Sequence, residues 1–311
     1  MPRAAHIRLL AWGAHAARFV RRHDSARVAA VFARSLYLQA GADFLCIGAE
    51  GIGLGPLNAT VQTDDWEHFA SALPAPGDRA DLGSRDVMVG RAVFDTTGAL
   101  SWSPPAWPAR KNGDDIPRRL AATLRALQDL VRERAPGAGL VRATLGLASQ
   151  EDGDPAVARL RRTAGPRIAA LAEWMQRRLQ GAVSHPAPVD LLGLGPGLTP
   201  SGDDLLGGAL IALRAIGRAD AVQDLDWQIA SEAAGATTPL SCAFLRAAAD
   251  GLGCASLHGA IAALLEDDRS ALAGDVDALG RIGHTSGWDA LAGAALALQA
   301  AVAARTPAPA Q

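Results

Sequence analysis

Residues 190–213 read DLLGLGPGLTPSGDDLLGGALIAL, and in this stretch the chain passes from a glycine-rich loop into a long helical pattern. Glycine lets a backbone turn sharply and approach a ligand closely. The N–H groups and partial positive charge at a helix start favour an anion such as phosphate or carboxylate. The stretch therefore predicts an anion site, whose candidate binding residues are Gly195, Gly197, Thr199, Ser201 and Gly202.

Two interpretations of this helix start stay open. Ser201 with Asp204 three positions later fits a capping box, in which both side chains only close the first helical turn. The three glycines ahead of it favour a ligand instead. The loop is not a Walker loop, because no lysine follows the glycines, and it lacks the βαβ context of a dinucleotide fingerprint. The chain's single lysine is Lys111, so a bound phosphate needs backbone N–H groups, arginine or a metal, and we expect no nucleotide or flavin.

The same helix start recurs near the end of the chain, because residues 201–213 align with SGWDALAGAALAL at residues 286–298. The alignment pairs a serine, an acid and a glycine of each copy: Ser201 with Ser286, Asp204 with Asp289, and Gly208 with Gly293. If the two helices cross at these glycines with their starts together, two helix dipoles converge on one anion. Ser286 is therefore a further candidate for the anion site.

Asp203 is the acid without a counterpart, since it aligns with Trp288. We therefore expect Asp204 and Asp289 to serve mainly their own helix starts, and Asp203 to carry chemistry. Carboxylate oxygens are the protein ligands that Mg²⁺ prefers. Asp203 with Asp204 is thus the candidate magnesium site, and Mg²⁺ is the cofactor that we expect.

Other polar residues are candidates for the same site. His284 directly precedes the second helix start and is a candidate catalytic acid or base, although a loop histidine bonded to nearby backbone fits equally well. Thr238 and Ser241 lie at another helix start, where N-capping is the favoured role and hydroxyls for the anion site are the alternative. Asn58 ends a second glycine-rich turn, GIGLGPLN, which most often forms a hairpin or bulge.

The first third of the chain predicts strands. Stretches with branched and aromatic residues, separated by turn residues, occur at 28–39, 43–48, 59–62 and 87–95. The Pro-rich segment 101–112 cannot continue a central strand, so we expect it to be a linker or packed loop. These features predict a β-rich, barrel-like N-terminal domain over residues 1–112.

The rest of the chain predicts helices. Apolar residues recur at three- and four-residue intervals from Ile116 to Val131, as in an amphipathic helix. A second helical stretch starts at Pro155, breaks at Gly165–Pro166 and resumes to Gly181. Nearly everything after Ser201 reads as helix. We therefore expect an α+β protein, with a mainly α-helical domain over residues 113–311.

Composition excludes several classes of function. The 30 basic and 32 acidic residues nearly cancel, which argues against a nucleic-acid binder. No segment approaches the length of apolar residues that a membrane span needs. Three widely spaced cysteines without a CxxC motif argue against a disulfide framework or a zinc site. We expect a cytoplasmic protein that binds a small anionic metabolite.

Two motifs together carry a family resemblance. GLGPGLTPSGDDLLGG at residues 193–208, followed by GHTSGWDALAG at 283–293, resembles a bacterial family that includes AllH, a subunit of the oxamate carbamoyltransferase of anaerobic allantoin degradation. The N-terminal GPLN at 55–58 and VGRAVFDTTGALSWSPP at 89–105 also resemble this family.

The resemblance implies a share in purine catabolism, in which oxalurate is cleaved by phosphate to oxamate and carbamoyl phosphate. It also implies a hetero-oligomer with an FdrA-like, acyl-CoA-synthetase-like subunit and a further companion subunit. The glycine-rich helix start would bind phosphate, and Asp203 would hold Mg²⁺ or orient the ureido nitrogen. Two alternatives remain open: a non-catalytic assembly subunit that binds an anionic ligand, and a stand-alone Mg²⁺-dependent hydrolase.

Overall fold

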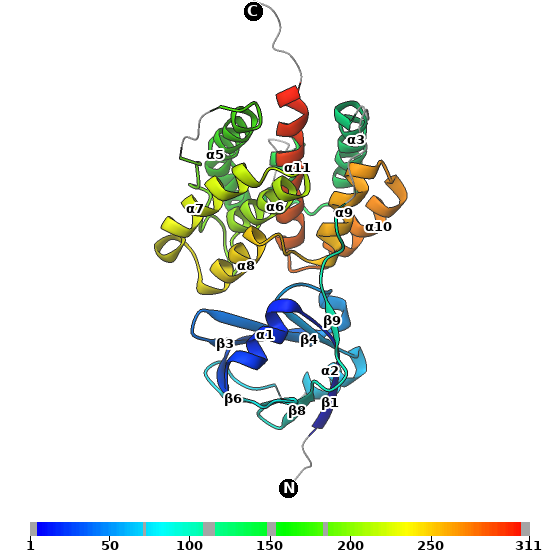
Figure 1. Cartoon of the computed structure of the whole chain (residues 1–311), viewed down its shortest axis with the longest axis vertical. Helices are drawn as coiled ribbons and strands as arrows, with labels where there is room; N and C mark the ends of the chain where they lie inside the picture. Colours follow the sequence, from blue (N-terminus) through cyan, green and yellow to red (C-terminus); the bar gives the residue numbers. More distant parts are fainter. Residues whose placement is uncertain (1–4, 71–72, 108–115, 148–153, 183–185, 306–311) are drawn as a thin grey trace, which may run out of the picture. The chain divides into compact units, whose positions relative to one another are not determined.

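The computed structural model describes residues 5–70, 73–107, 116–147, 154–182 and 186–305. The chain divides into two compact units, Met1–Pro104 and Pro105–Gln311. The first is drawn from blue to cyan in Figure 1, and the second from green to red. The domain boundary predicted near residue 112 falls in residues 108–115, outside the described part of the chain.

The first unit is a closed β-barrel of eight strands, with a short ninth strand on its edge. Strand β5 pairs with β4 on one side and with β1 on the other, which closes the ring. This confirms the barrel-like prediction. The strands are β1 (Ala5–Gly13), β2 (Ser25–Phe32), β3 (Ser35–Ala40), β4 (Asp43–Ala49), β5 (Asn58–Val61), β6 (Arg79–Leu82), β7 (Asp86–Val89), β8 (Ala92–Asp95) and β9 (Leu100–Trp102).

Two predicted strands are hairpins. The stretch 28–39 divides into β2 and β3, and the stretch 87–95 divides into β7 and β8 around a turn at Gly90, whose φ is 58°. A positive φ suits glycine and ends a strand sharply. The prediction of single strands there was wrong because branched residues continue on both sides of a short turn.

The barrel encloses its own apolar core. In β1, Ile7 and Leu9 are buried whereas His6 and Arg8 are exposed, which is the two-residue period of a strand with one buried face. Helices α1 (Ala14–Arg22) and α2 (Thr63–Ala70) add Phe19 and Trp66 to this core. The Pro-rich segment begins as β9, which pairs with β1 through Trp102.

The second unit is helical, as predicted. Its helices are α3 (Ile116–Arg134), α4 (Val141–Thr144), α5 (Pro155–Leu179), α6 (Ser201–Ala215), α7 (Ala219–Ala236), α8 (Pro239–Ala249), α9 (Ala255–Glu266), α10 (Arg269–Leu279) and α11 (Ser286–Arg305). Trp107, from the Pro-rich segment, stacks on the buried His258 ring of α9 with centroids 4.6 Å apart.

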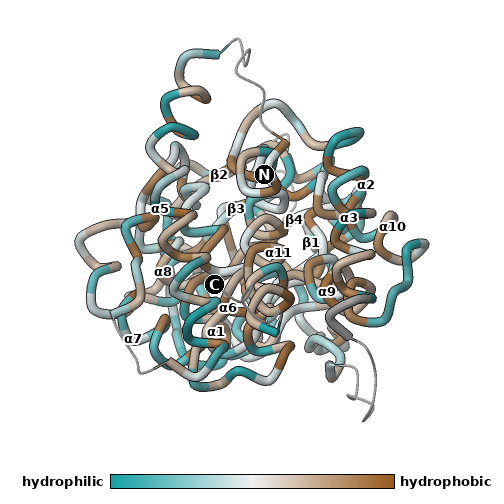
Figure 2. Tube along the Cα trace, turned by 90° about the horizontal axis from the view of Figure 1, so that it is seen from above, coloured by the Kyte–Doolittle hydropathy of each residue, from teal (hydrophilic) through white to brown (hydrophobic). Residues whose placement is uncertain are grey.

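Helix α5 runs through Pro166 without a break, so the predicted interruption at Gly165–Pro166 was wrong. Proline inside a helix loses one backbone hydrogen bond. Here Ala164, Ile168 and Leu171 are buried on both sides of the proline, and this packing keeps the helix continuous. Figure 2 shows hydrophilic and hydrophobic residues alternating along α5, as expected for a helix with one buried face.

Helix α11 lies at the centre of the helical unit, between α5 on one side and α3 and α9 on the other (Figure 1). It is long and apolar enough to cross a membrane by length and composition, but 67% of its apolar window is buried within the protein. A buried core helix passes the same test, so this property is weak support for a membrane span.

Candidate functional site

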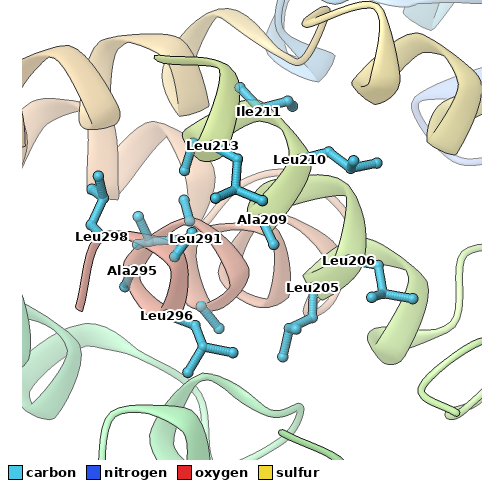
Figure 3. Close-up of a cluster of buried hydrophobic side chains, with 14 of the residues drawn as sticks. Leu205, Leu206, Ala209, Leu210, Ile211, Leu213, Leu291, Ala295, Leu296 and Leu298 are labelled. Carbon is cyan, nitrogen blue, oxygen red and sulfur yellow. The ribbon is translucent and has the colours of Figure 1, made fainter. Parts of the chain in front are cut away.

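Helices α6 and α11 cross at the two glycines that the sequence repeat pairs. A β-carbon added at Gly208 would overlap the Ala290 carbonyl oxygen, and one added at Gly293 would overlap the Leu205 carbonyl oxygen. Leu205 and Ala290 are themselves equivalent in the repeat. The crossing therefore has pseudo-twofold symmetry. Figure 3 shows the buried side chains around it, among them Leu205 and Ala295.

The symmetry extends into the turns before both helices. The Gly202 N–H donates to the Leu194 carbonyl (2.9 Å), and the Gly287 N–H donates to the Ile282 carbonyl (3.2 Å). The next residue in each turn is a glycine with positive φ, Gly195 at 121° and Gly283 at 59°. Sequence alignment missed this part of the repeat because the first turn is three residues longer than the second.

The two helix starts lie together, as the sequence repeat predicted. Thr199 Oγ1 and Ser286 Oγ are 3.0 Å apart, which joins the turn before α6 to the first residue of α11. We call this contact region the seam and define it by Thr199, Ser201, Asp204, Ser286 and Asp289.

The predicted capping box is wrong. The N-cap of α6 is Pro200, whose ring contains no hydrogen-bond acceptor. Ser201 is already the first residue of the helix. The N–H groups of Gly202 and Asp203 donate to the carbonyls of Leu194 and Pro200. Two of the N–H groups expected to bind an anion are therefore occupied. The half-buried Thr199 and Ser286 carry hydroxyls at the same helix starts, whereas Ser201 is buried.

Asp203 is buried and accepts hydrogen bonds on both oxygens. Oδ1 accepts the Gly193 N–H at 2.8 Å, and Oδ2 accepts the hydroxyls of Ser241 (2.6 Å) and Thr237. Gly193 has a φ of 69° and approaches Ala236 so closely that a β-carbon would overlap its carbonyl oxygen. Through these hydrogen bonds Asp203 connects the glycine loop to the junction of α7 and α8. The sequence did not point to Thr237 in this role.

Thr238 takes the N-capping role that was favoured for it. Its hydroxyl accepts the Ser241 N–H at 3.0 Å and donates to the Leu198 carbonyl at 2.5 Å. Ser241 lies beside it and points its hydroxyl to Asp203. Both residues therefore hold the glycine loop in place through hydrogen bonds. The tip of that loop, at Gly197 and Leu198, is exposed.

Asp204 has different surroundings from its neighbour. Its Oδ2 atom is buried and has no hydrogen-bond partner. Burial raises the pKa of Asp204 well above its ordinary value, and the nearby Asp289 and Asp203 carboxylates raise it further. The hydroxyls of Ser286 and Thr199 act in the opposite direction. The seam thus holds an acid that takes up a proton at a higher pH than an ordinary aspartate does.

Asp289 is the equivalent acid on α11, and it is fully buried. Its Oδ1 accepts the Leu140 N–H at 2.6 Å, while Oδ2 is buried without a partner. Asp289 therefore binds a distant loop as well as the Thr285 hydroxyl at its own helix start. Arg161 of α5 holds that loop through the carbonyls of Gly137 (2.8 Å) and Gly139 (3.3 Å). Burial raises the pKa of Asp289 to about 6.

We predict that Asp289 makes the protein less stable as the pH rises. A carboxyl with a raised folded-state pKa favours the fold at low pH, and this contribution is lost between the unfolded value near 4 and the folded value near 6. Chemical denaturation should show that the free energy of unfolding falls less with rising pH in Asp289→Asn than in the wild type. Over that range the difference should reach up to about 3 kcal/mol. Asp190→Asn, at an exposed loop residue, is the control. An unchanged pH slope in Asp289→Asn would contradict this account.

The remaining candidates are His284, in the turn before α11, and Asn58, in the barrel unit. His284 is exposed in the turn before α11, next to Thr285 and Ser286. Asn58 belongs to the barrel unit, where its side chain donates to the Gly53 carbonyl at 2.9 Å and closes the glycine-rich turn. Among the described residues, no group of three or more His, Cys, Asp or Glu side chains is arranged to hold a metal ion.

These features define a protein with a β-barrel unit and a helical unit, in which two copies of one helix-start motif meet at a seam with buried acids. Residues 191–298 match the family model described as oxamate carbamoyltransferase subunit AllH. The match covers both helix-start motifs and confirms, over this region, the resemblance drawn from the sequence. No solved structure matches the chain.

Proposed function

We propose that this chain is a subunit of an oxamate carbamoyltransferase-like enzyme and that its seam takes part in binding the substrates. One observation carries the proposal: the family match runs from residue 191 to residue 298, and the two motifs at its ends fold into a single seam. The substrates would be phosphate and oxalurate or a related ureido or acyl compound.

The phosphorolysis of oxalurate determines which groups a binding site must supply. A phosphate oxygen attacks the carbamoyl carbon of oxalurate, the bond from that carbon to the amide nitrogen breaks, and oxamate leaves with the electron pair on nitrogen. The phosphate proton ends on that nitrogen, so the atoms and charges balance. A site needs donors for the phosphate and for the carbamoyl oxygen. The hydroxyls of Thr199, Ser201 and Ser286 are the donors that the seam offers.

The Mg²⁺ site at Asp203 and Asp204 stays a prediction. Asp203 already accepts three hydrogen bonds, so a metal ion there would have to replace the hydroxyls of Thr237 and Ser241. Asp204 has a buried oxygen without a partner, so a metal ion there would replace no hydrogen bond of that oxygen. A single carboxylate leaves most of the coordination of Mg²⁺ to water or substrate oxygens.

Companion subunits are part of the proposal, and an FdrA-like subunit is the one implied by the resemblance. Among the described residues of the helical unit, two large apolar side chains are exposed, Leu198 at the tip of the glycine loop and Trp227 on α7. Aromatic side chains of this kind are enriched in protein interfaces. We place the complex in the cytoplasm, where the three free cysteines would remain reduced.

The test is reconstitution. The purified chain, its companion subunits and the complete mixture are each given oxalurate and phosphate, and carbamoyl phosphate is measured. We expect product from the complete mixture and none from the chain alone. Robust activity of the isolated chain would favour the stand-alone hydrolase or a self-sufficient enzyme. Full activity of the companions without this chain would favour a non-catalytic assembly role.

A further inference from the structure

The outer face of α7 carries a tryptophan, Trp227, that is 68% exposed. Helix α7 lies at the edge of the helical unit in Figure 1. Residues three and four positions apart lie on one face of a helix. The residues that follow Trp227 on its face are all exposed and uncharged: Ala230, Ser231, Ala234 and Gly235. An uncharged face with a large aromatic ring therefore runs from Trp227 to the C-terminal end of α7.

This face ends beside the glycine loop of the seam. Thr238, which follows α7, donates its hydroxyl to the Leu198 carbonyl at 2.5 Å, and Gly193 closely approaches the Ala236 carbonyl. Leu198 is 40% exposed and directly precedes the seam residue Thr199. We call the surface formed by the loop tip and the outer face of α7 the docking face, and define it by Leu198, Trp227, Ala230, Ser231, Ala234 and Gly235.

The docking face has the dimensions of one protein interface. Trp227 and Ala236 are nine residues apart in α7, which is about 14 Å along a helix. Each side of a standard interface covers about 800 Å², a patch about 30 Å across. One partner can therefore cover Trp227 and Leu198 together. A buried tryptophan near the centre of an interface is typical of the residues that dominate binding energy.

The charges of α7 indicate what kind of partner fits. The helix contains four acids and neither lysine nor arginine. Two of the acids, Asp220 and Asp224, each form an ion pair with Arg178 of α5 at 2.7 Å. The other two, Asp226 and Glu232, form no ion pair within the described part of the chain.

Asp226 and Glu232 flank the docking face on opposite sides. They lie one residue before and five residues after Trp227, so they are turned from it by about 100° and about 140° in opposite directions. Burial and the neighbouring Asp250 raise the pKa of Asp226, whereas Arg214 acts in the opposite direction. A partner with arginine or lysine on both sides of an apolar groove would complement this arrangement of an uncharged face between acids.

We propose that the docking face binds the FdrA-like companion subunit, through an apolar groove of that subunit that receives the Trp227 ring and is bordered by arginine or lysine. This inference rests on the proposed function. Because Leu198 directly precedes Thr199, the bound companion lies next to the seam. The substrate site is then at the interface between the two subunits.

The test measures binding of the purified full chain to the purified FdrA-like subunit by titration calorimetry. We expect Trp227→Ala to raise the Kd by at least about 30-fold, as for the dominant residue of an interface. Ala230→Arg adds bulk and a positive charge opposite a basic groove, so it should raise the Kd by at least about tenfold. Both positions are exposed in a helix, so the thermal stability of each variant should match the wild type. Leu100→Ala, at a leucine of the barrel unit that is 72% exposed, is the matched control and should bind normally.

Two further measurements separate docking from catalysis and charge from shape. Glu232→Gln should slow association and weaken its dependence on salt, because a flanking charge acts mainly on the association rate. With the companion in saturating excess, Trp227→Ala should form carbamoyl phosphate within about twofold of the wild-type rate, since only the assembly of the complex is weakened. A loss of rate that excess companion does not restore would contradict a role in docking alone.

The outcomes distinguish failure of the docking face from failure of the proposed function. If the wild-type complex forms but does not cleave oxalurate, the proposed reaction is wrong, and the binding data still decide the docking face. If the complex forms and is active while Trp227→Ala and Ala230→Arg bind like the wild type, the docking face alone is wrong. If these variants instead lose self-association, or binding of the further companion subunit, the face has another occupant and the proposal is overturned.

Discussion

Replacing Gly208 by alanine is expected to destabilise the helical unit by about 3 kcal/mol or more, because the added methyl group meets backbone atoms that cannot move aside. The group that it would overlap is the Ala290 carbonyl on α11. Relief requires the two central helices to separate, and their crossing is surrounded by buried leucines and alanines (Figure 3). Overpacking against a backbone carbonyl is more costly than against the end of a flexible side chain.

The neighbouring glycine supplies a matched control. A β-carbon at Gly207 would lie 3.7 Å from the Ala248 β-carbon, which is an ordinary contact. Alanine is also the better helix former, so Gly207→Ala should stabilise the protein by up to about 1 kcal/mol. Urea denaturation of both variants is the measurement. Equal effects of the two substitutions would show that the α6–α11 crossing is not as close as described.

Asp203→Asn is expected to cost about 3 kcal/mol, since a buried carboxylate that accepts three hydrogen bonds is replaced by an amide with one acceptor oxygen. At least one of its donors, the Gly193 N–H or the hydroxyls of Ser241 and Thr237, then loses its acceptor. The glycine loop should become protease-sensitive and exchange its amide hydrogens faster. Thermal denaturation and hydrogen exchange of the loop are the measurements.

Asp204→Asn is the control for this second prediction. It removes an acid that already has an unpartnered oxygen, so we expect stability at neutral pH to stay level or to rise. This is the opposite of the division expected from sequence, where Asp204 was to serve stability and Asp203 chemistry. A larger stability loss in Asp204→Asn than in Asp203→Asn would restore the original assignment.

The sequence predicted the local features and the contact between the two repeated helices, but it missed other contacts between distant residues. The apolar period after Ser201 and the repeat at Ser286 correctly predicted two equivalent helices, and their glycines predicted the crossing. Asp203 looked free for chemistry because its partners, Thr237 and Ser241, come from another helix start. No local pattern encodes such a pairing.

In the barrel, too, the sequence predicted local features and missed a contact between distant residues. Branched and aromatic stretches located most strands, but β1 was not predicted, although Ile7 and Leu9 alternate with polar residues. This strand closes the ring by pairing with β5. Closure depends on which strands meet, and that is decided by the packing of the whole barrel.

The most direct test of the central claim is the rate of carbamoyl phosphate formation from oxalurate and phosphate by the reconstituted complex with an altered seam. Thr199→Ala and Ser286→Ala each remove one hydroxyl of the 3.0 Å contact that joins the two helix starts. If the seam is the binding site, the rate falls by at least about tenfold in each variant, with assembly and thermal stability nearly unchanged. Wild-type rates in both variants would place the reaction elsewhere and contradict the account.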